Sequence, residues 1–424
     1  MIQHDLKKKI IVAHPGKQHS YRLASAVEKA DCLYQYITTV YDSDSSFWMK
    51  IVKRVIGKKD KQRANNRRTT LIPKNKITQF CELRGIIVLA ILRIDKSRKL
   101  YNLYNNHVTK AFGKKVAHYA IKHDVDAVIC YDTSAMYCFD ILKKKAPSII
   151  RIIDNAAMNR YGLCKLYQEL DRKYNILIDK TGFKSYLIDE KEAMIYKKEA
   201  FLANYHIAAS NFSKQTITQL GIPSNQVFVI PYGVDASKIK SKNVYTKAGK
   251  LKVLYVGEIS PQKGIYALLD SAEYFSGVVE FHIVGSGYEK LSTENQMKIK
   301  KLTKYHGYLL QEELFKLYSE CDVFLFPSLG DGFGFVVIEA MAAGLPVVCS
   351  SNSVGKDAVT EYEDGFVFQA GNTEEMNQWI KYFINNRNEV ERMGRKAAEK
   401  AKHFSWVEYD QQIESFLGEV LQQT

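Results

Sequence analysis

The feature that most constrains the fold is a repeated alternation between short apolar runs and longer amphipathic stretches. Nine runs rich in β-branched and aliphatic residues have the length of buried strands: 9–13, 127–131, 149–153, 205–209, 227–230, 251–256, 280–284, 322–327 and 346–350. Amphipathic stretches with helical periodicity separate many of them, for example 20–30, 211–220, 312–321 and 374–385. This alternation predicts an α/β fold, in which helices cover both faces of parallel sheets.

The length of the chain, 424 residues, predicts two domains rather than one core. The strand pattern starts again at Leu251, after a polar and lysine-rich stretch. We therefore place a first domain at 1–235, a linker at 236–250, a second domain at 251–403, and a terminal helix at 404–424 that could pack back on the first domain.

Cysteine usage and apolar run lengths bear on the location of the protein. The seven cysteines are scattered without CxxC spacing, which is typical of a reducing compartment. The run at 86–92 is far shorter than the ~20 residues that span a bilayer, and the run at 10–13 is shorter than a secretory signal core. We expect a cytoplasmic protein, peripheral at the inner face of the membrane.

The stretch "LGDGFGFVVIEAMAAGLPVV" joins an apolar strand, a Gly-rich loop and a helix. Glycines let a backbone approach a ligand closely, and the free N–H groups of a helix start attract anions. Asp331 in the loop is placed to meet sugar hydroxyls, and Glu339 in the helix is placed to accept two hydroxyls. The alternative interpretation is a capped helix, in which Asp331 caps and Glu339 is solvated.

Two further loops follow predicted strands in the same manner. In "YVGEISPQKG", Gly257 permits a tight turn and Lys263 is a flexible cation for a diphosphate, although a lone loop lysine is commonly just solvated. In "AHPGKQHS", Gly16 and Lys17 can face a ligand. His14 or His19 could act as a base, although a lone histidine is more often structural.

Several segments together resemble one known family. They occur in the family's order and are "AHPGKQHS", "SNFSKQTITQLGIPSNQVFVIPYGVD", "YVGEISPQKG", "HIVGSG", "LYSECDVFLFPS", "DGFGFVVIEAMAAGLPVV" and "VTEYEDGFVF". The chain is similar to the retaining, nucleotide-sugar-dependent glycosyltransferases of family 4, also called group 1. The likeness is good at 205–370 and poor at 40–200.

The resemblance implies a GT-B fold, in which two Rossmann-like domains face each other across a cleft. It implies that the donor sugar meets Asp331, that Glu339 binds the ribose of the nucleotide, and that Lys263 binds its diphosphate. The backbone N–H groups of Phe333, Gly334 and Phe335 would meet the sugar and phosphate. Gly16, Lys17 and Gly257 complete the implied donor site.

The sequence departs from the family pattern at three points. Asp331 is one methylene shorter than the usual glutamate, and Glu258 stands where many members carry arginine. The histidine that many members place after a first-domain strand is missing, and Asp132 stands there as a polar catalytic candidate. The catalytic candidates are therefore Lys263, Asp331 and Asp132, although an aspartate at such a position is more commonly a loop or cap residue.

A strongly basic segment lies at 46–76, where eleven Lys and Arg face one acid between Lys50 and Lys76. Its first part has aromatic and aliphatic residues on one helical face and cations on the flanks, a pattern that suits a helix in an anionic membrane interface. The alternative is an ordinary helix packed on its own sheet. No nucleic-acid motif accompanies the charge. The predicted membrane-binding residues are Trp48, Lys50, Ile51, Val52, Lys53, Arg54 and Val55.

These inferences predict an enzyme that moves a hexose or related sugar from a nucleoside diphosphate sugar to a saccharide or lipid-linked acceptor, with retention. We expect it to serve surface polysaccharide or glycolipid assembly. We expect no cofactor and no metal, and we set aside the "DSD" at 42–44 as a metal motif. Two alternatives are a nucleotide-sugar epimerase or hydrolase, and a non-catalytic membrane-binding module with a decayed donor site.

Overall fold

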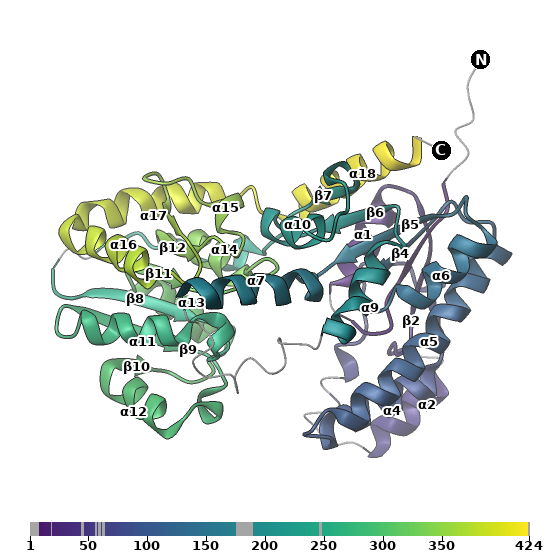
Figure 1. Cartoon of the computed structure of the whole chain (residues 1–424), viewed down its shortest axis with the longest axis horizontal. Helices are drawn as coiled ribbons and strands as arrows, with labels where there is room; N and C mark the ends of the chain where they lie inside the picture. Colours follow the sequence, from purple (N-terminus) through teal and green to yellow (C-terminus); the bar gives the residue numbers. More distant parts are fainter. Residues whose placement is uncertain are drawn as a thin grey trace.

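The computed structural model describes residues 8–17, 19–43, 46–55, 57, 61, 64–174, 190–245 and 248–422. Figure 1 shows two α/β domains side by side, with the second half of the chain forming one of them. The first domain contains a seven-stranded parallel sheet in the order β3-β2-β1-β4-β5-β6-β7. Its strands are β1 (Ile10–Ala13), β2 (Leu33–Thr38), β3 (Ile77–Gln79), β4 (Ala127–Tyr131), β5 (Ile150–Asn155), β6 (Tyr205–Ala208) and β7 (Val227–Val229).

The second domain contains a six-stranded parallel sheet in the order β10-β9-β8-β11-β12-β13. Its first strand, β8, lies in the middle and pairs with β9 on one side and β11 on the other. Its strands are β8 (Leu251–Val256), β9 (Val279–Val284), β10 (Thr303–Tyr305), β11 (Val323–Phe326), β12 (Val347–Ser350) and β13 (Gly365–Phe368).

Helices connect the strands of both sheets. In the first domain they are α1 (Ser20–Lys29), α2 (Phe47–Val55), α4 (Glu82–Ile94), α5 (Lys99–Lys122), α6 (Met136–Lys145), α7 (Arg160–Tyr174), α9 (Glu190–Ala200) and α10 (Asn211–Thr218). The later helices are α11 (Ile265–Tyr274), α12 (Thr293–Leu302), α13 (Gln311–Glu320), α14 (Phe335–Ala342), α15 (Gly355–Ala358), α16 (Thr373–Asn385), α17 (Arg387–Ala401) and α18 (Trp406–Gln422). Short 3-10 turns are η1 (Lys74–Lys76), η2 (Ser224–Gln226), η3 (Ala236–Lys238), η4 (Pro261–Lys263) and η5 (Tyr288–Lys290).

The predicted α/β class is confirmed, and each of the nine predicted strands overlaps an observed one. Central strands such as β1 and β12 are buried along their whole length, which explains their uninterrupted apolar sequences. Four strands escape the apolar signal for physical reasons. β3 and β10 have three residues each and are only half-buried, β2 is interrupted by Gln35, and β13 is short and begins with glycine.

The terminal helix α18 packs on the first domain although it follows the second domain in the chain (Figure 1). Lys29 on α1 pairs with Asp410 at 2.5 Å, and the guanidinium of Arg22 lies 4.5 Å from the ring of Trp406. The apolar side of α18 is buried through six residues, Tyr409, Ile413, Phe416, Leu417, Val420 and Leu421. This helix therefore contributes a wall of the first domain's core.

None of the described helices combines the length and the apolar composition that crossing a membrane requires.

Truncation of a buried α18 side chain should destabilise the first domain. Ile413→Ala removes a fully buried side chain, and a substitution of this kind costs about 2–5 kcal/mol because it leaves a cavity. We expect the midpoint of thermal unfolding, followed by circular dichroism, to fall by several degrees. The control Glu414→Ala changes an exposed neighbour on the same helix. Equal midpoints for the two variants would contradict the packing of α18.

Candidate functional site

The Gly-rich loop at 329–334 connects the end of β11 to the start of α14. Gly334 directly precedes the helix and has a φ of 89°. This left-handed conformation favours glycine. The N–H groups of Phe335 and Val336, at the start of α14, have no partner within the helix, whereas the N–H of Val337 donates to the carbonyl of Gly334 at 2.9 Å. The loop and the helix start thus form an electropositive backbone corner at the carboxyl edge of the sheet.

Asp331 and Lys263 form an ion pair in this corner, between Lys263 Nζ and Asp331 Oδ2. The other carboxylate oxygen of Asp331 accepts a hydrogen bond from the backbone N–H of Phe333 at 3.1 Å. The backbone N–H of Asp331 donates to the carbonyl of Asn352 at 2.9 Å. The structure therefore brings together two predicted site residues that are far apart in sequence, and each satisfies the charge of the other.

The loop that carries Lys263 is joined to the Gly-rich loop by close backbone contacts. Leu329 N–H donates to the carbonyl of Gln262 at 2.8 Å, and the side-chain amide of Gln262 donates to the carbonyl of Gly330 at 3.2 Å. Gly264 has a φ of 77°, and a Cβ there would overlap the carbonyl oxygen of Pro327. Only glycine permits this approach, which holds the position of the adjacent Lys263.

Gly257, at the end of β8, packs directly against Gly285, at the end of β9. A Cβ on Gly285, whose φ is 151°, would overlap the carbonyl oxygen of Gly257. Gly285 N–H donates to the carbonyl of Gly307 at 2.8 Å. The ends of β8, β9 and β10 therefore converge beside the loop at 306–310, where Tyr308 and Leu310 are exposed.

Glu339 is half-buried on α14. The alternative interpretation, in which Glu339 is a solvated helix residue, therefore does not hold. Burial raises the pKa of Glu339 to about 6, and the neighbouring hydroxyl of Tyr318 opposes this rise. Tyr318 itself is fully buried. A carboxylate in such a place gains from hydroxyl partners that replace lost water.

Glu258, the acid that stands in place of a basic residue, is paired with Lys290. Glu258 Oε1 and Lys290 Nζ lie 2.8 Å apart, and both side chains are exposed. The negative charge of Glu258 is therefore balanced within the second domain.

The first domain contributes an aromatic group to this corner around Lys263, Asp331 and the start of α14, which we call the donor corner after the ligand that the sequence predicts for it. The ring of Tyr232 stacks on that of Phe335 with centroids 5.5 Å apart and an interplanar angle of 11°. The imidazole of His19 lies 4.8 Å from Tyr232 and 5.1 Å from Phe335. Burial lowers the pKa of His19, as expected for a ring held neutral between aromatic groups.

The first domain also holds the Gly-rich loop through its backbone. The hydroxyls of Ser210 and Ser213, at the start of α10, both donate to the carbonyl of Gly332, at 2.7 and 2.9 Å. A Cβ on Gly332 would lie 3.0 Å from the Cα of Ala157. Sequence reasoning missed Tyr232 and these serines, although "SNFS" and "PYG" lay inside the segments that carried the resemblance.

Gly16 and Lys17 lie on the first-domain side. Gly16 N–H donates to His14 Nδ1 at 2.6 Å, and Thr38 Oγ1 donates to the carbonyl of Gly16 at 3.1 Å. Burial and the nearby Arg67 lower the pKa of Lys17. Among the described residues, the neighbours of Lys17 belong to the first domain. The structure therefore does not place Lys17 beside Lys263.

Asp132 follows the carboxyl end of β4. Burial raises its pKa to about 7, and the positive charge of Arg160 opposes this rise. The start of α6 is capped by Glu199 rather than by Asp132, because Glu199 accepts from the N–H groups of Thr133, Ala135 and Met136 at 2.7, 2.8 and 2.9 Å. The carboxyl group of Asp132 is thus not engaged as the cap of this helix.

The predicted membrane-binding residues lie on α2, away from the donor corner (Figure 1). Phe47, Trp48 and Ile51 are exposed to 66%, 39% and 37%, and Lys50 and Arg54 are also exposed. Val52 and Lys53 are half-buried, and Lys53 pairs with an acid of its own domain, Asp42, at 2.6 Å. The side chain of Val55 and residue 56 lie outside the described part of the chain.

Residues 237–400 match the sequence model of a family described as glycosyl transferases group 1. The chain is 28% identical over 260 residues to the capsular polysaccharide biosynthesis glycosyltransferase CapM of Staphylococcus aureus, covering 56% of this chain and 67% of that protein. It is 24% identical over 217 residues to O-antigen chain mannosyltransferase B of Escherichia coli, covering 47% of this chain and 56% of that protein. The chain thus spans about half to two thirds of the length of these curated relatives.

Among solved structures, the chain is similar to Anabaena HepE in complex with UDP, with a TM-score of 0.61 and 17% identity. The likeness covers 97% of this chain and 100% of that chain. It shows the fold, and the predicted GT-B class is confirmed.

The raised pKa of Glu339 predicts a pH-dependent stability difference. Between pH 4.5 and about 6 the folded chain binds more protons at Glu339 than the unfolded chain does, so rising pH removes stability. Glu339→Gln abolishes this loss. The free energy of unfolding of the variant relative to wild type should therefore rise by about 1–2 kcal/mol from pH 4 to pH 7, measured by urea denaturation. For the exposed control Glu312→Gln, the difference in free energy of unfolding from wild type should not depend on pH. The same result for Glu339→Gln would refute the raised pKa of Glu339.

Proposed function

We propose that this chain, whose residues 237–400 match the sequence model of the group 1 glycosyl transferases, transfers a sugar from a nucleoside diphosphate sugar to an acceptor hydroxyl with retention. The observation that carries the proposal is the ion pair of Lys263 and Asp331 beside the start of α14, where the N–H groups of Phe335 and Val336 have no partner within the helix. It places a cation for phosphate, a carboxylate for hydroxyls and a helix start within one corner.

In the proposed donor complex, the diphosphate takes the place of Asp331 as the partner of Lys263. Asp331 then turns to the sugar hydroxyls, for which its two oxygens are acceptors. Glu339, half-buried on α14, accepts from the ribose hydroxyls. The nucleobase lies at the converging ends of β8, β9 and β10, next to Gly257.

The reaction breaks the bond between the anomeric carbon and the diphosphate oxygen, and the electron pair leaves with the diphosphate. Lys263 and the α14 N-terminus stabilise the negative charge that develops there. The acceptor oxygen then bonds to the anomeric carbon on the face that the diphosphate leaves, which retains the configuration. The acceptor proton passes to a base, for which Asp132, with a pKa of about 7, is the candidate.

The biological setting that we propose is the assembly of a surface polysaccharide or glycolipid on the cytoplasmic side of a membrane. The names of CapM and of O-antigen chain mannosyltransferase B support this setting. The exposed aromatic and aliphatic residues of α2, flanked by exposed Lys50 and Arg54, support peripheral binding to an anionic leaflet.

A thermal-shift panel with UDP, GDP, ADP, CDP and dTDP tests the donor site. We expect one nucleotide to stabilise the protein by about 2.7 kcal/mol at 100 times its Kd. Lys263→Ala should weaken the stabilisation by that diphosphate while leaving that of the matching nucleoside unchanged. Glu339→Gln should weaken both, because the ribose is common to both ligands.

The matched control in this panel is Lys381→Ala, which removes an exposed cation of α16 in the same domain, outside the loops of the site. It should leave the shifts unchanged. If no nucleotide stabilises the wild type at millimolar concentration, the proposed donor site is wrong and the decayed-site alternative returns.

Sedimentation with liposomes tests the membrane part. The wild type should pellet with vesicles that contain anionic phospholipid at moderate salt, and less so as salt screens the cations. Trp48→Ala combined with Ile51→Asp should abolish pelleting, because both side chains are exposed on α2. Met297→Asp, at an exposed apolar residue of the second domain, is the control. Equal pelleting of all three proteins would sink the proposal that α2 binds the membrane.

A further inference from the structure

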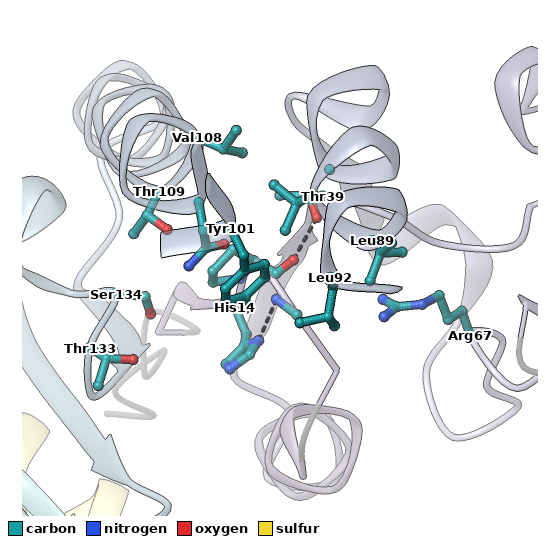
Figure 2. Close-up of a pocket in the computed structure, with 15 residues that line it drawn as sticks. His14, Thr39, Arg67, Leu89, Leu92, Tyr101, Val108, Thr109, Thr133 and Ser134 are labelled. Carbon is teal, nitrogen blue, oxygen red and sulfur yellow. Dashed lines mark hydrogen bonds between the residues drawn. The ribbon is translucent and has the colours of Figure 1, made fainter. Parts of the chain in front are cut away.

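A cavity of about 260 Å³ lies in the first domain at the carboxyl ends of β1, β2 and β4. Figure 2 shows its lining, in which residues from the strand ends face residues of α4 and α5. The polar side is formed by His14, Thr39, Asn105, Thr109, Thr133 and Ser134. In parallel sheets, ligands bind at this edge.

Arg67 is the single charged residue among those that line the cavity. Its guanidinium end points into the cavity in Figure 2, and no described residue accepts a hydrogen bond from it. Asp42 donates its backbone N–H to the carbonyl of Arg67, but its carboxylate pairs with Lys53 at 2.6 Å. The cavity thus offers an arginine that has no acidic partner among the described residues.

Two further cations lie near Arg67. Burial and the charge of Arg93 lower the pKa of Arg67, and burial and the charge of Arg67 lower the pKa of Lys17. A cation whose pKa is lowered by a neighbouring positive charge is stabilised in its charged form by a bound anion. Arg67 can meet a phosphate through two N–H groups at once.

The wall beside Arg67 is aliphatic. It consists of Val88, Leu89 and Leu92 of α4. Helix α4 has 13 residues and is apolar on most sides, yet only Gly85 and Val88 are buried. A helix of this composition is ordinarily covered by other apolar groups.

Exposed aliphatic side chains continue this wall onto the surface. On α4 and α5 they are Leu83, Ile87, Ile94, Leu100 and Leu103. Helix α2 lies against the same helix, because its Met49 packs with Ile86 and Leu89. The apolar surface therefore runs from the cavity to the face that carries Trp48.

The opposite end of the cavity is connected along the chain to residues near the donor corner. Thr133, which lines the cavity, follows Asp132 in the chain. The loop that contributes His14 and Gly16 to the lining continues to His19, whose ring contacts Phe335 at the start of α14. A saccharide at this end would lie next to the proposed transfer site.

We propose that the cavity binds an amphiphilic acceptor through its phosphate group, with Arg67 holding the phosphate and an aliphatic chain lying along α4. The chemistry that is recognised is an anionic head on an apolar chain. The role of this molecule as acceptor rests on the proposed function, whereas its binding does not. A saccharide attached to the phosphate would extend past Thr133 and Ser134.

Calorimetric titration of the full chain with three probes tests the site. Farnesyl phosphate carries both head and chain, inorganic phosphate carries the head alone, and farnesol carries the chain alone. We expect farnesyl phosphate to bind about tenfold or more tightly than either of the others. Arg67→Gln should weaken the binding of farnesyl phosphate by about tenfold and leave the binding of farnesol unchanged. Arg67→Lys should restore part of the lost affinity for farnesyl phosphate.

Arg84→Gln is the matched control, because Arg84 lies exposed on α4, the helix that forms the aliphatic wall, but does not line the cavity. It should bind farnesyl phosphate as the wild type does. Equal binding of inorganic and farnesyl phosphate, equal loss in Arg67→Gln and Arg84→Gln, or no binding of farnesyl phosphate would each overturn the proposal. Nucleotide thermal shifts on Arg67→Gln report on the donor site separately, so failure of one site is distinguished from failure of the other.

Discussion

The architecture of the site depends on how closely the backbone of the Gly-rich loop passes between the two domains. At Gly332 the carbonyl accepts two serine hydroxyls of the first domain, and the Cα lies against the chain at Ala157. A side chain at this position would crowd that backbone. Because the loop is fixed from both sides, Asp331 and the start of α14 have defined positions before any ligand arrives.

The charges in the donor corner are paired with one another. Lys263 and Asp331 neutralise each other, and Glu258 is balanced by Lys290. In the proposed complex, a bound diphosphate replaces Asp331 as the partner of Lys263. Lys263 then keeps a negatively charged partner, and no other charge in the corner has to move. The cavity on the first domain differs, since Arg67 has no acidic partner among the described residues that line it.

Much of the fold could be predicted because strands buried on both faces are written as continuous apolar runs. The site residues Asp331, Glu339 and Lys263 could be selected because strand, glycine and helix follow one another in sequence. The sequence could not select Tyr232, Ser210 or Arg67, because their roles arise from contacts between segments that are far apart in the chain. The basic segment shows the same limit, since the pattern did not reveal that Lys53 turns inward to Asp42.

The return of α18 to the first domain means that the chain passes between the domains twice, once near Gly233 and once near Ser405. The two passages touch, because Val234 N–H donates to the carbonyl of Phe404 at 2.8 Å and Gly233 packs against the backbone of Trp406. The two connections between the domains therefore lie side by side and are hydrogen-bonded to each other. The domains are covalently joined at one place rather than at two separate points, and neither connection can move there without the other.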